Sequence, residues 1–413
     1  MSAHLMCLTS AGGIPIFARQ KGDGDAITFS KMASLNGVHM FLKSQNINLF
    51  CTDLPDTTVV WKEFENSIIL IIIASGATKY VLDKFLNSVF SAMVFFVGID
   101  EIRNLKNVEK LKKDLRFCNP IIDRFLECLD VGEKISARTD FVNMIECVMP
   151  SENHLLQTCL DGYVECLDSM YGCILIHGCL AVATTGWWSL DPVERKLLII
   201  AVSTEGDYTV RDLPVFLPCK SPNVAFRLVS VTLISNVEVL ALCGPSPDLT
   251  EIERLSSQCW KNSIEALRSS EQCYPRNISS TISLDSAVLG FLLVNYKVNK
   301  FVLAKNSQSA NHRITGTHRL DILRTFYHQA VETFIDLNDD SEKSNEEETK
   351  KSTCTFTGAK ETYWCSEYHK CHAVKDGNHV LSVLYTSTVP AHTMRLISQK
   401  ILKTLLADKQ TCW

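Results

Sequence analysis

Residues 57–75 read TTVVWKEFENSIILIIIAS, and this stretch decides the fold. Two runs rich in β-branched residues, 57–64 and 67–75, flank Glu65 and Asn66, which predicts two strands joined by a tight turn. Residues 79–97 then carry apolar side chains at helical spacing, namely Leu82, Phe85, Leu86, Val89, Met93 and Phe96. A strand pair followed by a long amphipathic helix predicts an antiparallel sheet with a helix packed on one face.

The segment before this stretch completes the first unit. HLMCL (4–8), the turn SAGG and IPIFAR (14–19) predict a hairpin. A helix is then expected to start at Ser30 as N-cap, with Leu35, Val38 and Leu42 on one face. SLNGVHMF (34–41) lies within it, although its Asn-Gly pair is also a hairpin signal and its polar residues could belong to an active site.

The same mixture of strands and helices occurs twice more. From about residue 153 a helix is followed by apolar runs that we interpret as strands, among them KLLIIAVS (196–203), and a third unit begins near 283. A chain of 413 residues is long enough for two to four domains. We therefore predict three α+β domains, at 1–130, 150–272 and 280–413, with an acidic flexible insert at 338–352.

The composition excludes several classes of protein. A net charge of −5 and a pI near 6.1 exclude wholesale nucleic-acid binding. Seventeen scattered cysteines, most in apolar runs, indicate reduced packing residues, and the first residues lack a signal-peptide pattern, so a reducing cytoplasmic location is expected. The apolar runs 67–74 and 89–99 are shorter than the roughly 18–20 residues that span a bilayer, and we expect core elements.

No segment carries a motif for covalent chemistry. The chain lacks a P-loop, a G-x-S-x-G elbow and an H-E-x-x-H helix. CSEYHKCH (365–372) crowds Cys365, His369, Cys371 and His372, whereas structural zinc uses separated ligand pairs. We favour an adventitious cluster over a zinc site, and we predict no catalytic, cofactor or metal residues.

Two further patterns leave alternatives open. GWW (186–188) ends an apolar strand, so one tryptophan packs in the core or anchors an interface. A helix expected over 101–117 carries an excess of cations, Arg103, Lys106, Lys110, Lys112 and Lys113 among them. Such a run is either a solvated face or a patch for anionic lipid such as phosphoinositide membranes.

Several blocks resemble one known family. They are SLNGVHMF, TTVVWKEFENSI, AMVFFVGIDEIRNLKNVEKLKKDLR (92–116), GWW, DLPVFLP (212–218), SPNVAFRL (221–228) and LCGPSPDL (242–249). In order and spacing they resemble the Fuzzy family of planar-cell-polarity effectors, over most of residues 34–255. Beyond about 280 only the general pattern of elements is similar.

The resemblance implies both a fold and a function. It implies three longin-type domains, each a five-stranded antiparallel sheet flanked by helices, as in tri-longin Rab exchange factors. It also implies a scaffold for cilium biogenesis in the CPLANE complex, located in the cytoplasm, at the cytoskeleton and at the basal body. Members pair with Inturned, join Wdpcp and a Rab-like small GTPase, and support recruitment of intraflagellar-transport proteins and membrane trafficking to the cilium.

The resemblance also bears on the first helix and on activity. It places SLNGVHMF on the helix between strands two and three, with Asn36 and His39 as surface polar groups and Gly37 under a neighbouring backbone. We predict that Asn36, Gly37, His39, Met40 and Trp61 contact a partner or the GTPase. Guanine nucleotide exchange by the Inturned heterodimer is the first hypothesis, a GTP-dependent adaptor without exchange activity is the second, and a thiol- or metal-dependent enzyme is a distant third.

Overall fold

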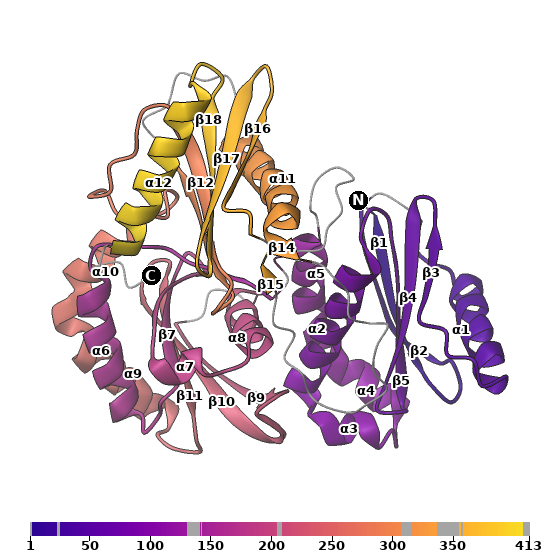
Figure 1. Cartoon of the computed structure of the whole chain (residues 1–413). Helices are drawn as coiled ribbons and strands as arrows, with labels where there is room; N and C mark the ends of the chain where they lie inside the picture. The colour runs from indigo at the N-terminus through magenta and orange to yellow at the C-terminus, as the bar shows by residue number, and fades with distance from the viewer. Residues whose placement is uncertain are drawn as a thin grey trace.

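The computed structural model describes residues 2–22, 25–129, 141, 143–204, 209–306, 316–336, 355–356 and 358–407. Figure 1 shows three α+β domains, each a sheet with helices packed against it. The sheets share one strand order, which confirms the predicted class of three α+β domains, each a mostly antiparallel sheet flanked by helices. The insert predicted at 338–352 lies outside the described residues.

The first domain is built around its central strand. Its strands are β1 (Ala3–Thr9), β2 (Pro15–Lys21), β3 (Cys51–Leu54), β4 (Thr57–Phe64) and β5 (Ile68–Ala74), in the order β2-β1-β5-β4-β3. Its helices are α1 (Phe29–Ser44), α2 (Lys79–Val97), α3 (Ile99–Arg103), α4 (Val108–Asp114) and α5 (Asn119–Cys128), with a 3₁₀ turn at Leu115–Cys118. Alternate β5 residues point to opposite faces: Leu70 and Ile72 lie in the core under α2, and Ile69 and Ile71 in the smaller core under α1. A central strand buried on both faces explains the uninterrupted apolar run.

The hairpin β4–β5 turns where the sequence predicts. Glu65 and Asn66 both adopt positive φ, as type I′ turns require. Helix α1 begins two residues before the predicted position because Thr28, not Ser30, is the N-cap and accepts a hydrogen bond from Lys31 N. Helix α2 is long and apolar enough to cross a bilayer by length and composition, but its apolar side chains, such as Phe85 and Met93, form the domain core.

The helix predicted over 101–117 is broken into three pieces. Asn104 ends α3 with non-helical backbone, and Asn107 starts α4 as an N-cap that accepts a hydrogen bond from Lys110 N at 3.0 Å. The helical spacing of apolar residues therefore continues through 104–107, where the helix is interrupted, and no proline or glycine there indicates the interruption. The cations of this segment consequently do not lie on one helix face.

The second domain corrects two predictions. Its strands are β7 (Gly172–Ile176), β8 (Cys179–Ala183), β9 (Val210–Leu217), β10 (Ser221–Ile234) and β11 (Val237–Cys243), and its helices α6 (Asn153–Cys166), α7 (Thr185–Trp188), α8 (Pro192–Thr204), α9 (Leu249–Trp260) and α10 (Ile264–Glu271), with a 3₁₀ turn at Lys261–Ser263. KLLIIAVS belongs to α8 and is not a strand. The helix is buried on most sides, between α5, α2 and its own sheet, so the sequence shows no polar face.

GWW forms a helical turn, α7, rather than a strand end. Trp187 is fully buried, and Trp188 lies between two cations, with Arg195 Cζ at 5.1 Å and Lys300 Nζ at 5.0 Å from its ring. Lys300 comes from the third domain, so Trp188 anchors the interface between domains two and three.

The third domain receives a strand from the linker. Its strands are β12 (Val288–Asn295), β13 (Lys300–Lys305), β16 (Glu361–Cys365), β17 (His369–Asp376) and β18 (His379–Thr386), and its helices α11 (Gly316–Phe334) and α12 (Ala391–Ala407). The short β6 (Ile145–Glu146) adds a sixth, parallel strand beside β13, and β14 (Ile335–Asp336) pairs with β15 (Thr355–Phe356). The run TYWCSEYHK (362–370) turns at 366–368 and supplies both β16 and the start of β17.

Candidate docking surface on the first domain

Helix α1 turns apolar side chains toward solvent. Within residues 29–54, seven large apolar side chains are at least 43% exposed: Phe29, Val38, Met40, Phe41, Ile47, Phe50 and Leu54. We call these seven residues the α1 surface. Figure 1 shows α1 on the side of the first sheet away from α2 and from the other two domains. A monomer seldom leaves so many apolar side chains in solvent, so the α1 surface is the candidate docking site of the domain.

The inner side of α1 is anchored by polar groups, which corrects the prediction for two residues. Asn36 and His39 are buried against the sheet, not displayed on the surface. Trp61 is also buried and donates a hydrogen bond from Nε1 to the Leu35 carbonyl at 3.4 Å. Asn36 Nδ2 lies 3.3 Å from Met40 Sδ. Asn36, His39 and Trp61 therefore lie beneath the helix, and the Trp61 hydrogen bond ties it to β4. Met40 is exposed, and its contact with a partner stays a prediction.

Gly37 does not serve the purpose that we predicted for it. Apart from the residues next to Gly37 in the chain and the backbone of its own helix, no atom lies within 4 Å of the position of a Cβ at Gly37, so no other element requires a glycine there. The close approach occurs instead at Gly13 in the β1–β2 turn, with φ +60°, where a Cβ would lie 2.3 Å from Asn36 Nδ2. Gly37 leaves an open, flat spot beside Val38 and Phe41 where a partner can approach the helix backbone.

A pocket of about 400 Å³ lies beside the C-terminal half of α1, with His39, Lys43 and Trp61 among its lining residues. Lys43 Nζ and Glu63 form an ion pair at 2.6 Å, and Ser10 also donates to Glu63. Burial alone would raise the pKa of Glu63, but the hydrogen bonds from Lys43 and Ser10 outweigh it and lower that pKa. Burial lowers the pKa of His39, so the imidazole is neutral at pH 7. The pocket thus offers a polar margin to the apolar α1 surface.

The predicted lipid patch is partly neutralised. Arg103 pairs with Glu65 at 2.6 Å, Lys110 with Glu101 at 3.2 Å, and Lys112 with Glu109 at 2.8 Å. Lys106 and Lys113 are exposed, and among the described residues neither has an ion pair. Two cations rather than five are therefore available to an anionic surface.

The four residues of the Cys/His cluster lie on the β16–β17 hairpin. Cys365 is exposed, while His369, Cys371 and His372 are buried. Burial raises the pKa of the Cys371 thiol and lowers that of His372, which lies 3.7 Å from Glu361. In the described part of the chain no group of three metal-ligating side chains is close enough to hold an ion.

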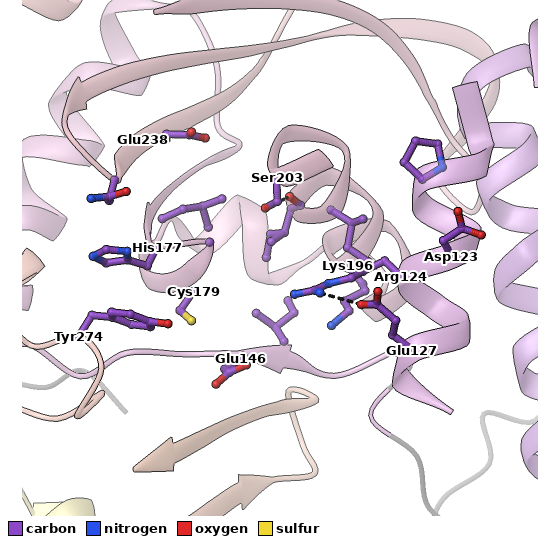
Figure 2. A pocket seen from close by; sticks show the side chains of 17 residues that line it. Asp123, Arg124, Glu127, Glu146, His177, Cys179, Lys196, Ser203, Glu238 and Tyr274 are labelled. Atoms are coloured by element: carbon purple, nitrogen blue, oxygen red, sulfur yellow. Dashed lines mark hydrogen bonds and ion pairs between the residues drawn. The ribbon is translucent and has the colours of Figure 1, made fainter. Parts of the chain in front are cut away.

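Figure 2 shows a second pocket, of about 650 Å³, where α5, β6, α8 and the second sheet meet. Four carboxylates and two cationic side chains line it: Asp123, Glu127, Glu146, Glu238, Arg124 and Lys196. His177 and Tyr274 stack with ring centroids 4.1 Å apart on the side opposite Lys196. Arg124 and Glu127 pair at 2.8 Å. The excess of carboxylates disfavours an anionic ligand such as a nucleotide, so this pocket does not carry the proposed function.

Sequence reasoning missed most of the α1 surface. Six of the seven residues were not predicted as contact residues, because apolar periodicity assigns such side chains to a core: Phe29, Val38, Phe41, Ile47, Phe50 and Leu54. One signal in the sequence was available: residues 29–54 carry more large apolar side chains than one face of one helix can bury.

Comparisons with known proteins cover nearly the whole chain. Family models described as the first, second and third longin domains of FUZ, MON1 and HPS1 match residues 3–125, 167–261 and 287–409. A protein fuzzy homolog of Xenopus tropicalis is 35% identical over 421 residues, covering 98% of each chain. The mouse protein fuzzy homolog is 32% identical over 97% of each chain, and the human one is 36% identical over 79% of this chain and 78% of its own.

Proposed function

This chain belongs to the Fuzzy family of proteins with three longin domains, and on that premise we propose that it is a planar-cell-polarity effector and scaffold in cilium biogenesis. In this proposal it pairs with Inturned, and the pair regulates a Rab-like small GTPase by promoting guanine nucleotide exchange. Wdpcp completes the complex, which acts in the cytoplasm at the basal body and supports recruitment of intraflagellar-transport proteins and membrane trafficking to the cilium.

The α1 surface is the observation that carries the proposal. Seven exposed apolar side chains within residues 29–54 need a protein partner to remove them from water. Trp61 ties the helix to the sheet from beneath and Asn36 and His39 are buried there, so the surface is already formed before the partner arrives. We assign this surface to Inturned.

Exchange of this kind requires no covalent chemistry by the chain. A regulator that binds the nucleotide-free GTPase more tightly than the loaded form lowers the affinity for nucleotide by the same factor. The proposal therefore needs no nucleophile, metal or cofactor from this protein. The second candidate is a GTP-dependent adaptor, which would prefer the GTP-loaded GTPase and release no nucleotide.

Contact with phosphoinositide membranes is a subsidiary part of the proposal. Of the five cations predicted for the lipid patch, Lys106 and Lys113 are exposed without an ion pair in the described part of the chain, and each adds about 1 kcal/mol near an anionic leaflet. Two such cations give a weak, salt-sensitive attraction that assists an assembly held by other contacts.

Release of fluorescent GDP from candidate Rab-like GTPases tests the function. We expect faster release when this chain and Inturned are both present than with either protein alone. Unchanged release, together with binding that requires GTP, would favour the adaptor. Failure of the chain to bind Inturned would refute the assignment of the α1 surface.

A further inference from the structure

The chain covers most of the open edges of its own sheets. Three five-stranded sheets have six edges, and four of these are covered by other segments. On β13 the linker donates a hydrogen bond from Cys147 N to the Phe301 carbonyl at 2.7 Å, and on β8 it donates one from Val148 N to the Leu180 carbonyl at 2.9 Å. Helix α5 covers β2, where Arg19 Nε donates to Asp123 Oδ1 at 2.7 Å, and α2 packs against β9.

The edge strand β3 is protected by its own sequence. It has four residues, carries the exposed Asp53, and is followed directly by Pro55. Short length, charge and proline are the usual devices that keep an edge strand from pairing with another chain. This leaves β16 as the remaining edge.

The register of β16 shows which of its backbone groups are unpaired. Lys375 N donates to the Lys360 carbonyl at 2.8 Å, and Ser366 N donates to the His369 carbonyl at 2.9 Å. Backbone groups alternate in direction along a strand, so residues 360, 362, 364 and 366 point toward β17. The N–H and C=O groups of Glu361, Tyr363 and Cys365 therefore point outward. Nothing in the described part of the chain pairs with this side of β16.

Aromatic side chains surround this open edge. Tyr363 is 66% exposed and Trp364 is 41% exposed, and they lie on opposite faces of the sheet. Tyr368, in the adjoining turn, is 75% exposed. The strand, ETYWC, contains no proline and no lysine, and its carboxylate, Glu361, is paired with Arg395, so it carries less protection than β3.

We propose that β16 is a docking site for an extended, uncharged segment of a partner protein, which adds to the third sheet as a further strand. Three outward N–H groups and three outward C=O groups specify a β-strand, because only an extended backbone repeats its own donors and acceptors at this spacing. Tyr363 and Trp364 favour β-branched or aromatic residues as cross-strand neighbours on both faces.

The charges near the strand explain why the segment is uncharged. Glu361, the charged residue of β16, pairs with Arg395 at 3.0 Å. On the neighbouring strand, Lys370 Nζ donates to the Val389 carbonyl at 2.7 Å. The charge carried by β16 itself is therefore already paired, and the edge offers an incoming segment backbone hydrogen bonds and aromatic surface instead of a counter-charge.

A displayed library of random decapeptides, selected on the full chain, tests the proposal. We expect peptides with alternating β-branched and aromatic residues, and about tenfold or greater weakening of their Kd by Tyr363→Pro, which deletes an outward donor and leaves the β17 ladder intact. Tyr363→Lys keeps that donor and adds an edge charge, so it should weaken binding even if the proline variant fails to fold. Tyr368→Lys is the control, since it removes an equally exposed aromatic beyond the strand.

Hydrogen exchange of the backbone amides supplies a second readout, because non-specific adsorption of a peptide to the aromatic side chains would not change the exchange rates of these amides. The amides of Glu361, Tyr363 and Cys365 should exchange rapidly in the free chain and become protected with bound peptide, while that of Trp364 is protected in both. Failure to select any peptide, equal binding by the Tyr363→Pro variant, or equal loss in Tyr368→Lys would overturn the proposal. A concentration-dependent dimer abolished by Tyr363→Lys would also overturn it, because the occupant would then be a second copy.

Discussion

Replacing Phe41 by Ser tests the α1 surface most directly. Phe41 is 66% exposed, so the substitution removes little of the domain's own packing. A phenylalanine side chain presents roughly 200 Å² at most, which leaves about 130 Å² for a partner to cover. At about 25 cal/mol per Å², full burial of this area contributes about 3 kcal/mol, or about 150-fold in Kd. Association costs reduce this gain, so we expect a loss between about tenfold and 150-fold.

The assay is calorimetric titration of the full chain with Inturned, with thermal unfolding measured in parallel. Phe117→Ser is a matched control, because Phe117 is 67% exposed in the same domain but lies on the 3₁₀ turn away from α1. The free energy of unfolding should change by less than about 0.5 kcal/mol in both variants. A Phe41→Ser variant that binds Inturned within about threefold of the parent, or a control that loses as much, would refute the reasoning.

Four further predictions follow from the described geometry. Gly37→Glu should weaken Inturned binding in the same titration without lowering the melting temperature, because the position is exposed and unobstructed. Replacing Lys106 and Lys113 by Gln should reduce sedimentation with phosphoinositide vesicles at low salt, and equal sedimentation of parent and variant would show that the segment is only a solvated face. Burial lowers the pKa of His328 to about 4, so the imidazole takes up a proton more readily in the unfolded chain than in the folded one. The free energy of unfolding should therefore fall by about 3 kcal/mol between pH 6.5 and pH 4. His328→Phe should flatten this part of the pH profile of unfolding. Cys371→Ser should cost about 1–3 kcal/mol in urea unfolding, because it buries a hydroxyl in an apolar site, and zinc lost together with folding in this variant would contradict that account.

The strands were predictable where the pattern of apolar residues reflects how many faces of the strand are buried. The β4–β5 hairpin carries β-branched runs on both sides of a two-residue turn, and its central strand is apolar at every position because both faces are covered. KLLIIAVS has the same composition, yet it is the helix α8, because a helix buried on most sides loses the polar stripe that would reveal its period. Composition alone does not separate these two environments.

The docking site was harder to predict because α1 inverts the usual rule. Its apolar residues Val38 and Phe41 face solvent, whereas Asn36 and His39 face the sheet. Periodicity shows that a helix has two unlike faces but does not say which face meets the core. A sequence block shared with a family pointed to this helix, and only the coordinates showed which of its residues are buried and which remain exposed to a partner.

The two proposed docking surfaces, the α1 surface and the β16 edge, would make different demands on their partners. The α1 surface is built from side chains, so a partner must match the shape of Phe41 and its neighbours, and single substitutions there should change specificity. The β16 edge is built mainly from backbone groups, which every extended segment can match, so its affinity should depend on strand propensity more than on a particular sequence. Trp188 ties the third domain to the second, and α2 and α5 pack the first against it, so one core continues through all three domains. A partner bound at the α1 surface is therefore held at a fixed distance from β16, and so is any protein bound to that partner. The α1 surface can then supply the specificity that the backbone groups of β16 alone do not provide.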